Sequence, residues 1–243
     1  MFTLKTGSSA LINTIMSNPK QLTFPWNKSF HSSFESFYVD PQNEQLISSL
    51  KNISINENIY IYGLKNSGKT YLLQSLCNEY SKSNKSSLFL PLIDVIKHGI
   101  EIIDSIENMD LVCIDGLEII SHNKEWEIGL FNLINNALQT GCRLVFTSSS
   151  EEGKINFSLA DLDSRIRKFQ SYEIFSISDE HLFKALKKIS NLRSITLGEK
   201  EAQYLITYTK RNIADLVNIL ESLDQLSIEN KRRITIPLIK ELL

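Results

Sequence analysis

From residue 58 onward, short apolar runs alternate with segments of helical periodicity. The strand-like runs are residues 59–62, 87–90, 111–115, 143–147 and 172–175. The helix-like segments between them are residues 71–80, 100–106 and 124–139, and Gly141 follows the last of these where a C-cap glycine belongs. Strands that alternate with helices predict an α/β fold, in which helices sandwich a parallel sheet.

Past residue 176 only helical signals remain. Ser178 is predicted to cap one helix, and residues 196–199 have the form of a capping box that opens a second. Pro237 fits the first turn of a last helix. A further helix is predicted by apolar residues at helical spacing, which are Ile213, Leu216, Val217, Leu220 and Leu223. We therefore expect an α/β domain over residues 31–176 and a small all-helical domain over residues 177–243.

The N-terminal part, residues 1–57, lacks such periodicity and is rich in Ser, Asn and Pro. We expect residues 1–30 to form a flexible segment. Residues 1–15 are expected to be a disordered tail or an artefact of the start site, because Met16 and the residues after it would make a start of their own.

Composition narrows the class of protein. The chain has 243 residues, 42% of them hydrophobic, and a formal net charge of -2. Such a length buries a core without disulfides, and three scattered cysteines fit core thiols in a reducing compartment.

No apolar run reaches the roughly 18 residues of a membrane span, and the N-terminus does not resemble a signal peptide. The near-neutral charge opposes wholesale non-specific DNA binding, and the basic run 231–233 indicates a solvated helix end. We expect a cytoplasmic protein that binds neither membrane nor a specific DNA sequence directly.

Residues 63–70 fill every position of the P-loop pattern G-x-x-x-x-G-K-[ST], between a strand-like run and a helix. Glycines permit a tight turn whose backbone N–H groups face phosphate oxygens, the lysine reaches the β and γ phosphates, and the threonine hydroxyl binds Mg²⁺. The alternative is a chance glycine turn before a helix. The residues assigned to purine-nucleotide binding are Gly63, Asn66, Ser67, Gly68, Lys69, Thr70, Tyr71 and Asp115.

Asp115 ends an apolar strand-like run, where P-loop proteins hold magnesium, and it forms the predicted metal pair with Thr70. It is otherwise a strand-terminal aspartate that caps the next turn. Hydrolysis also needs a carboxylate or glutamine that orients water. Gly116 cannot do this, and Glu118 is a weak substitute that would face the same side if the strand continued. We expect nucleotide binding with impaired hydrolysis.

Two other segments carry candidate chemistry. Arg165 lies in residues 161–167, and an arginine can stabilise a transferring phosphate in cis or from a neighbouring protein. Taken alone, such a residue is more often a surface charge. In residues 21–25, apolar anchors and a polar residue suit docking into a partner's groove, although the segment also fits an ordinary linker. The four histidines show no metal-binding spacing.

From about Gln21 to Leu243 the chain resembles the AAA+ module of the replication initiator DnaA, and in particular the DnaA regulatory inactivator family, Hda. Residues 34–39 are similar to the segment beside the adenine, and residues 111–118 to the Walker B strand. Further similar segments are residues 125–128 with 131–132, residues 159–166 and residues 235–241. The resemblance implies a P-loop base followed by a helical lid.

The same resemblance implies roles for single residues. The arginine finger falls on Arg165, and the motif that binds the sliding clamp of DNA polymerase III falls on Gln21, Leu22, Phe24 and Pro25. The chain also stops after the lid, with no room for the initiator's duplex-binding domain, which favours the inactivator. Two departures are Ala214 in place of the sensor-2 arginine and Ser149 near the polar sensor position, where the family usually has aspartate. Arg211, one turn before Ala214, is not assigned the sensor role.

These implications describe a regulator and not an enzyme. It would hold ADP or ATP with Mg²⁺, link DnaA to the DNA-loaded clamp, and offer Arg165 to the ATP bound by DnaA. One alternative is a DnaA-like or helicase-loader-like ATPase that acts through its own hydrolysis. Another is a nucleotide-free scaffold. The resident nucleotide and self-association stay open.

Overall fold

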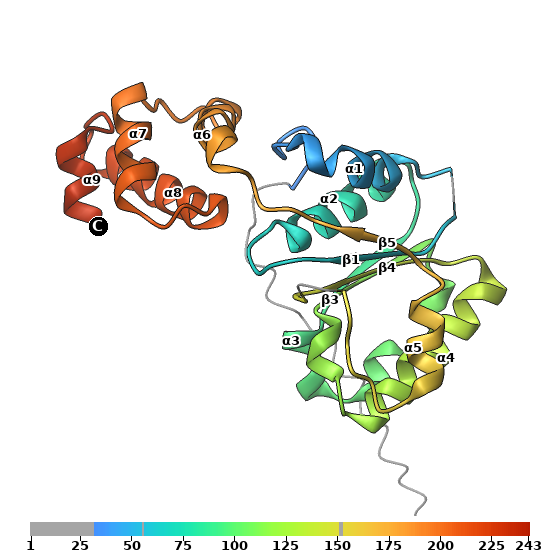
Figure 1. The fold of residues 1–243 in the computed structure, drawn as a ribbon. Helices are drawn as coiled ribbons and strands as arrows, with labels where there is room; N and C mark the ends of the chain where they lie inside the picture. The colour runs from blue at the N-terminus through green and yellow to red at the C-terminus, as the bar shows by residue number, and fades with distance from the viewer. Residues whose placement is uncertain (1–31, 55, 151–152) are drawn as a thin grey trace, which may run out of the picture. The chain divides into compact units, whose positions relative to one another are not determined.

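The computed structural model describes residues 32–54, 56–150 and 153–243 (Figure 1). The described residues form a parallel sheet of five strands in the order β2-β3-β4-β1-β5. The strands are β1 (Ile59–Tyr62), β2 (Ser87–Pro91), β3 (Leu111–Asp115), β4 (Arg143–Ser148) and β5 (Gln170–Glu173). The predicted parallel sheet is confirmed, and its first four strands lie within one residue of the predicted positions.

The last strand, β5, was predicted over residues 172–175 and lies two residues earlier. Phe175 leaves the sheet because its backbone pairs with a side chain instead. The Asn43 amide accepts from the Phe175 N–H at 2.9 Å and donates to the Phe175 carbonyl at 2.9 Å. A side chain 132 residues away therefore ends the strand, which no local pattern reveals.

Helices cover both faces of the sheet. In Figure 1, α1 (Glu44–Lys51) and α2 (Lys69–Lys82) lie on one face, and α3 (Leu92–Val95), α4 (Lys124–Thr140) and α5 (Ala160–Ile166) lie on the other. Short 3-10 turns connect these elements at Pro41–Asn43, Ile96–His98, Ile100–Ile103, Ile106–Asn108 and Leu117–Ile120.

The sequence reading of the helices needs corrections, among them the short helix α3, which was not predicted. Helix α1 lies in a region predicted to be irregular, where Leu46, Ile47 and Leu50 form a short buried face. The helix predicted over residues 100–106 is instead a pair of 3-10 turns, because Ser105 between them takes a left-handed φ of 63°. A residue at positive φ cannot continue a right-handed helix.

The C-terminal helices are α6 (Asp179–Leu192), α7 (Glu199–Tyr208), α8 (Ile213–Glu229) and α9 (Ile236–Leu242). Ser178 is the N-cap residue of α6, as predicted, although its hydroxyl donates to Asp40 and makes no capping bond. The predicted capping box is wrong, because Gly198, and not Thr196, is the N-cap of α7. Asn212 caps α8, since its side chain accepts from the N–H groups of Ala214 and Asp215.

Two hydrophobic clusters lie within the compact unit His31–Leu243. One packs α1 and α2 against the sheet, and the other joins α6 to α9. Cys113 and Cys142 are buried, as predicted for core thiols, and Cys77 is half-buried. Among the described residues, no helix is long and apolar enough to cross a membrane.

Asp40 ties the segment before α1 to the start of α6. Its carboxylate accepts from the N–H and hydroxyl of Ser178, both at 3.4 Å, and from His181 at 3.0 Å. Burial alone would raise the pKa of Asp40, but the bonds from His181, Gln42 and Ser178 outweigh it and hold the pKa below its usual value. The buried carboxylate therefore stabilises the connection between β5 and α6.

Candidate functional site

The P-loop connects β1 to α2 through backbone conformations that favour glycine. Gly68 has a φ of 98° and is the N-cap of α2, and Gly63 has a φ of 150°. A Cβ on Gly63 would lie 2.5 Å from the Ile174 carbonyl oxygen, and a Cβ on Gly68 would lie 2.8 Å from the Phe37 ring. Residues with a Cβ do not fit at either position. The two glycines therefore allow the backbone of the loop to approach a ligand closely at the N-terminus of α2.

Lys69 folds back over this loop and is 6% exposed. Its ammonium donates to the Gly63 carbonyl at 2.9 Å, the Leu64 carbonyl at 2.6 Å and the Ser67 hydroxyl at 3.3 Å. Burial lowers the pKa of Lys69, whereas the negative charges of Asp115 and Glu118 act to raise it. The lysine is therefore held at the loop, where its charge meets phosphate oxygens in P-loop proteins.

Thr70 and Asp115, the predicted metal pair, lie in direct contact. The Thr70 hydroxyl donates to one carboxylate oxygen of Asp115 at 2.6 Å, and the Thr147 hydroxyl donates to the other at 2.5 Å. Such hard oxygen atoms suit Mg²⁺, which keeps most of its ligands from water and phosphate. Among the described residues, no three His, Cys, Asp or Glu side chains form a metal site. The pair fits a magnesium ion carried by a nucleotide.

Thr147 was not predicted. It lies at the end of β4, next to β3, and the Gly116 N–H donates to both its carbonyl and its hydroxyl. The sequence reading placed the polar sensor near Ser149, whereas Thr147 is the β4 residue that contacts Asp115. The strand register, which pairs Ile114 with Phe146, brings these side chains together.

Strand β3 ends at Asp115 as predicted, so the continued strand on which Glu118 would share a side with Gly116 does not form. Gly116 turns the chain with a φ of 87°, and Glu118 lies on the 3-10 turn that follows. The Glu118 charge opposes the lowering of the Lys69 pKa by burial, and it adds to the burial that raises the pKa of Tyr60. One of its carboxylate oxygens is buried and has no hydrogen-bond partner among the described residues. The charge of Glu118 therefore acts on the phosphate-binding lysine despite the offset of Glu118 along the chain.

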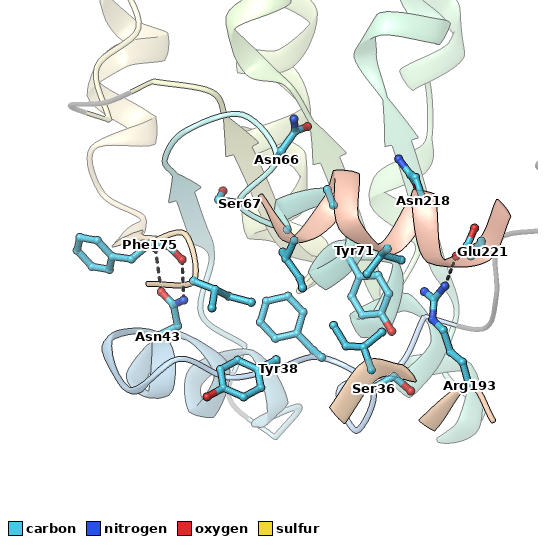
Figure 2. Close-up of a pocket in the computed structure, with 17 residues that line it drawn as sticks. Ser36, Tyr38, Asn43, Asn66, Ser67, Tyr71, Phe175, Arg193, Asn218 and Glu221 are labelled. Atoms are coloured by element: carbon cyan, nitrogen blue, oxygen red, sulfur yellow. Dashed lines mark hydrogen bonds and ion pairs between the residues drawn. The ribbon is translucent and has the colours of Figure 1, made fainter. Parts of the chain in front are cut away.

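A cavity of about 250 Å³ lies beside the P-loop (Figure 2). Four of the predicted nucleotide-binding residues line it, namely Asn66, Ser67, Gly68 and Tyr71. Phe37 stacks on Tyr71 with ring centroids 5.8 Å apart, and it belongs to the segment expected beside the adenine. The wall thus combines aromatic faces with backbone N–H groups, which suits a base joined to phosphates.

The opposite wall comes from α6 and α8. Arg193, at the end of α6, forms an ion pair with Glu221 of α8, and both line the cavity (Figure 2). Ala214 lines it too, so the position of the missing sensor-2 arginine does face the cavity. Arg211 pairs with Asp179 at 2.9 Å. Sequence reasoning missed Arg193 as a cavity residue, because its place in the wall depends on its ion pair with Glu221, 28 residues away.

The candidate finger Arg165 lies at a different place. It lines a second cavity, of about 270 Å³, together with Glu57 and Asn58, which directly precede β1. Its guanidinium lies over the Phe131 ring, 5.9 Å from the centroid. Among the described residues, no acidic side chain pairs with Arg165, whereas Arg167 pairs with Asp163 at 2.6 Å. Gln21, Leu22, Phe24 and Pro25 lie outside the described residues.

Two protein-family models match the chain and together cover most of it. The bacterial DnaA ATPase domain matches residues 27–174, and the Hda lid domain matches residues 179–243. The chain belongs to the DnaA-related AAA+ family, with an Hda-type lid. An uncharacterized protein of Haemophilus influenzae is 32% identical over 228 residues, which cover 92% of this chain and 98% of that protein.

Solved structures share the AAA+ fold of this DnaA-related protein. Domain III of DnaA from Thermotoga maritima superposes with a TM-score of 0.74 at 20% identity, over 90% of this chain and 98% of that one. AMPPCP-bound DnaA from Aquifex aeolicus gives a TM-score of 0.66 at 22% identity, over 81% of this chain. This chain spans 65% of the Aquifex protein. The predicted P-loop base with a helical lid is therefore confirmed.

The Lys69 contacts predict the result of one substitution. Lys69→Ala should weaken nucleotide affinity at least tenfold, about 1.4 kcal/mol, because it removes the positive charge buried at the loop. Isothermal calorimetry with ADP and ATP measures this. Lys65→Ala removes an exposed lysine of the same loop and should bind as the wild type does. Equal affinity for all three proteins would remove the P-loop assignment.

Proposed function

We propose that this chain is a nucleotide-binding regulator of replication initiation that inactivates DnaA. It links DnaA to the DNA polymerase III sliding clamp and stimulates hydrolysis of DnaA-bound ATP through Arg165 in trans. The output is conversion of ATP-DnaA to ADP-DnaA, which prevents a second round of initiation. The family assignment supports the DnaA pathway, and the position of Arg165 supports action on a partner's nucleotide.

The position of Arg165 relative to its own P-loop carries the proposal. Arg165 shares a cavity with Glu57 and Asn58, at the amino end of β1, whereas the P-loop follows the carboxyl end of that strand. A strand of four residues is about 13 Å long. The guanidinium and its own phosphate-binding loop thus lie at opposite ends of the strands, which supports action of Arg165 on the nucleotide of another protein.

The resident nucleotide in this proposal is ADP or ATP. Lys69 would neutralise its phosphates, and Phe37 and Tyr71 would flank its base. Mg²⁺ would be held by the phosphates together with Thr70 and Asp115, and it would screen the phosphate charge. The nucleotide-bound DnaA of Aquifex supports this assignment by its fold.

The sliding clamp is the second proposed partner. Gln21, Leu22, Phe24 and Pro25 would insert into a groove of the clamp, with Leu22 and Phe24 as apolar anchors. Pull-down of purified clamp by the wild-type chain and by Gln21→Ala tests this step. Equal recovery of clamp by both proteins would remove the motif from the proposal.

The whole proposal is tested by reconstitution. Purified DnaA loaded with labelled ATP is mixed with DNA-loaded clamp and this chain, and conversion to ADP is followed with time. We expect conversion to require both the clamp and this chain. Conversion at the same rate without this chain would overturn the proposal.

The chain alone is expected to hydrolyse ATP barely above background. Gly116 has no side chain with which to orient water, and the Ala214 methyl group cannot contact a γ-phosphate. Steady-state measurement of phosphate release by the isolated chain checks this. A turnover of about 1 per second, the low end for typical enzymes, would favour an ATPase that acts through its own hydrolysis.

Glu118 supplies the control for that measurement. Its charge acts on Lys69, so it is the carboxylate that would orient water if the chain did hydrolyse ATP. Glu118→Gln should leave the background rate unchanged under our proposal. A measurable wild-type rate that falls in Glu118→Gln would identify Glu118 as the hydrolytic carboxylate.

A further inference from the structure

Glu127 is a carboxylate buried at the start of α4, where its side chain is 0% exposed. Its two oxygens accept three backbone N–H groups. One oxygen accepts from His122 at 2.8 Å and from Ser158 at 3.0 Å, and the other accepts from Leu159 at 2.7 Å. Three short hydrogen bonds to a charged acceptor hold the loop before α4 and the loop before α5 in a fixed arrangement.

Two of these donors immediately precede α5, the helix that carries Arg165. Leu159 is the N-cap of α5, and it makes no side-chain capping bond. Leucine is a poor N-cap because it has no acceptor for the unpaired N–H groups at a helix start. Glu127, from the neighbouring helix, instead accepts from the N–H of the N-cap residue Leu159 and of Ser158 before it, and its charge is favourable at the amino end of the helix dipole.

The same face of α4 contacts the other end of α5. Phe131 follows Glu127 by four residues, and residues at that spacing lie on one side of a helix. The Arg165 guanidinium lies over the Phe131 ring, 5.9 Å from its centroid. Helix α4 therefore holds the short helix α5 at both ends, by hydrogen bonds at its start and by a cation–π contact at Arg165.

We propose that Glu127 is a positioning residue for Arg165, fixing the place and direction from which the finger is presented to a partner's nucleotide. This inference rests on the proposed function of Arg165 in trans. Stabilisation of a transferring phosphate depends on preorganised geometry, and a misplacement of about 1 Å can cost 10²-fold in rate. A hydrogen-bonded carboxylate without exposure to water provides such a fixed support.

Glu127→Gln changes this support while keeping its shape. One end of an amide is an oxygen and the other is an NH₂ group, which is a donor. If the oxygen faces His122 and Ser158, the NH₂ group opposes the Leu159 N–H, and the reverse orientation loses the other two bonds. Either way α5 loses part of its anchor. Glu127→Asp is the second variant, because it keeps the charge but withdraws the carboxylate by one methylene.

The experiment is the clamp-dependent conversion of ATP-DnaA, measured over a range of concentrations of this chain. We expect Glu127→Gln and Glu127→Asp to lower the maximal rate about 10- to 100-fold. The concentration that gives half the maximal rate should stay unchanged, since the docking surfaces are retained. Glu125→Gln is the matched control, because Glu125 lies in the same helical turn and is exposed. Calorimetry with ADP verifies that each variant folds.

A double variant tests whether Glu127 acts through Arg165. If it does, Glu127→Gln combined with Arg165→Ala is no slower than Arg165→Ala alone. A further loss in the double variant would overturn the inference, as would an altered half-maximal concentration at an unchanged maximal rate. If Glu127→Gln is as active as Glu125→Gln while Arg165→Ala is inactive, this inference is overturned and the proposed function stays intact. A fully active Arg165→Ala overturns both.

Discussion

Replacing Arg165 by alanine is expected to reduce the stimulated hydrolysis of DnaA-bound ATP by about 10³- to 10⁵-fold, the range observed for arginine fingers supplied in trans. The guanidinium lies beside Glu57 and Asn58, at the amino end of β1, whereas the P-loop follows the carboxyl end of that strand. Its removal should therefore leave this chain folded, bound to nucleotide and attached to the clamp. The measurement is clamp-dependent conversion of ATP to ADP on purified DnaA, with nucleotide affinity of this chain determined in parallel.

Two further variants make the Arg165 result specific. Arg165→Lys should fail almost as badly, because an ammonium lacks the planar fork that donates to two phosphate oxygens. Arg167→Ala should stimulate as well as the wild type, because Arg167 is exposed and paired with Asp163 one turn earlier on the same helix. Equal stimulation by the Arg165 and Arg167 alanine variants would show that Arg165 is not the finger.

The largest expected effect on stability belongs to Arg143, which is 1% exposed at the start of β4. Its guanidinium donates to the carbonyls of Ser49, Leu50, Asn52 and Glu57 and to the Tyr80 hydroxyl, at distances between 3.1 Å and 3.5 Å. These carbonyls include the unpaired ones at the end of α1, where positive charge is favourable. Arg143→Ala should reduce the free energy of unfolding by about 3–5 kcal/mol, since it leaves buried carbonyls unpaired and a cavity behind.

Urea unfolding of the nucleotide-free protein, followed by circular dichroism, measures this loss. The matched control is Arg233→Ala, an exposed arginine whose removal should change the free energy by less than about 0.5 kcal/mol. An Arg143→Ala loss below about 1 kcal/mol would contradict the view that this side chain anchors α1 to the sheet. Nucleotide binding should be affected only through stability, because Arg143 does not line the cavity beside the P-loop.

The sequence by itself determined the features that depend on neighbouring residues. Apolar runs closed by glycine or polar residues predict β1 to β4 within one residue, because a strand buried on both faces leaves a continuous local signal. The P-loop is equally local. Gly63, Gly68, Lys69 and Thr70 must follow a strand and open a helix at fixed spacing, and they do. The contact between Thr70 and Asp115 agrees with the order of the motifs, because Thr70 follows β1, Asp115 ends β3, and the carboxyl ends of parallel strands lie at the same end of the sheet.

Only the tertiary structure decided what depends on partners far along the chain. Asn43 ends β5 from 132 residues away, and Arg143 stabilises α1 across more than 80 residues, so neither has a local pattern. The same holds for the hydrogen bond from Thr147 to Asp115 and for the hydrogen bond that Glu127 accepts at the start of α5. A buried polar side chain is satisfied by whichever backbone or side-chain group the fold brings to it, and a sequence records the group but not its partner. The ends of elements and the fine positioning of Arg165 therefore depend on the fold.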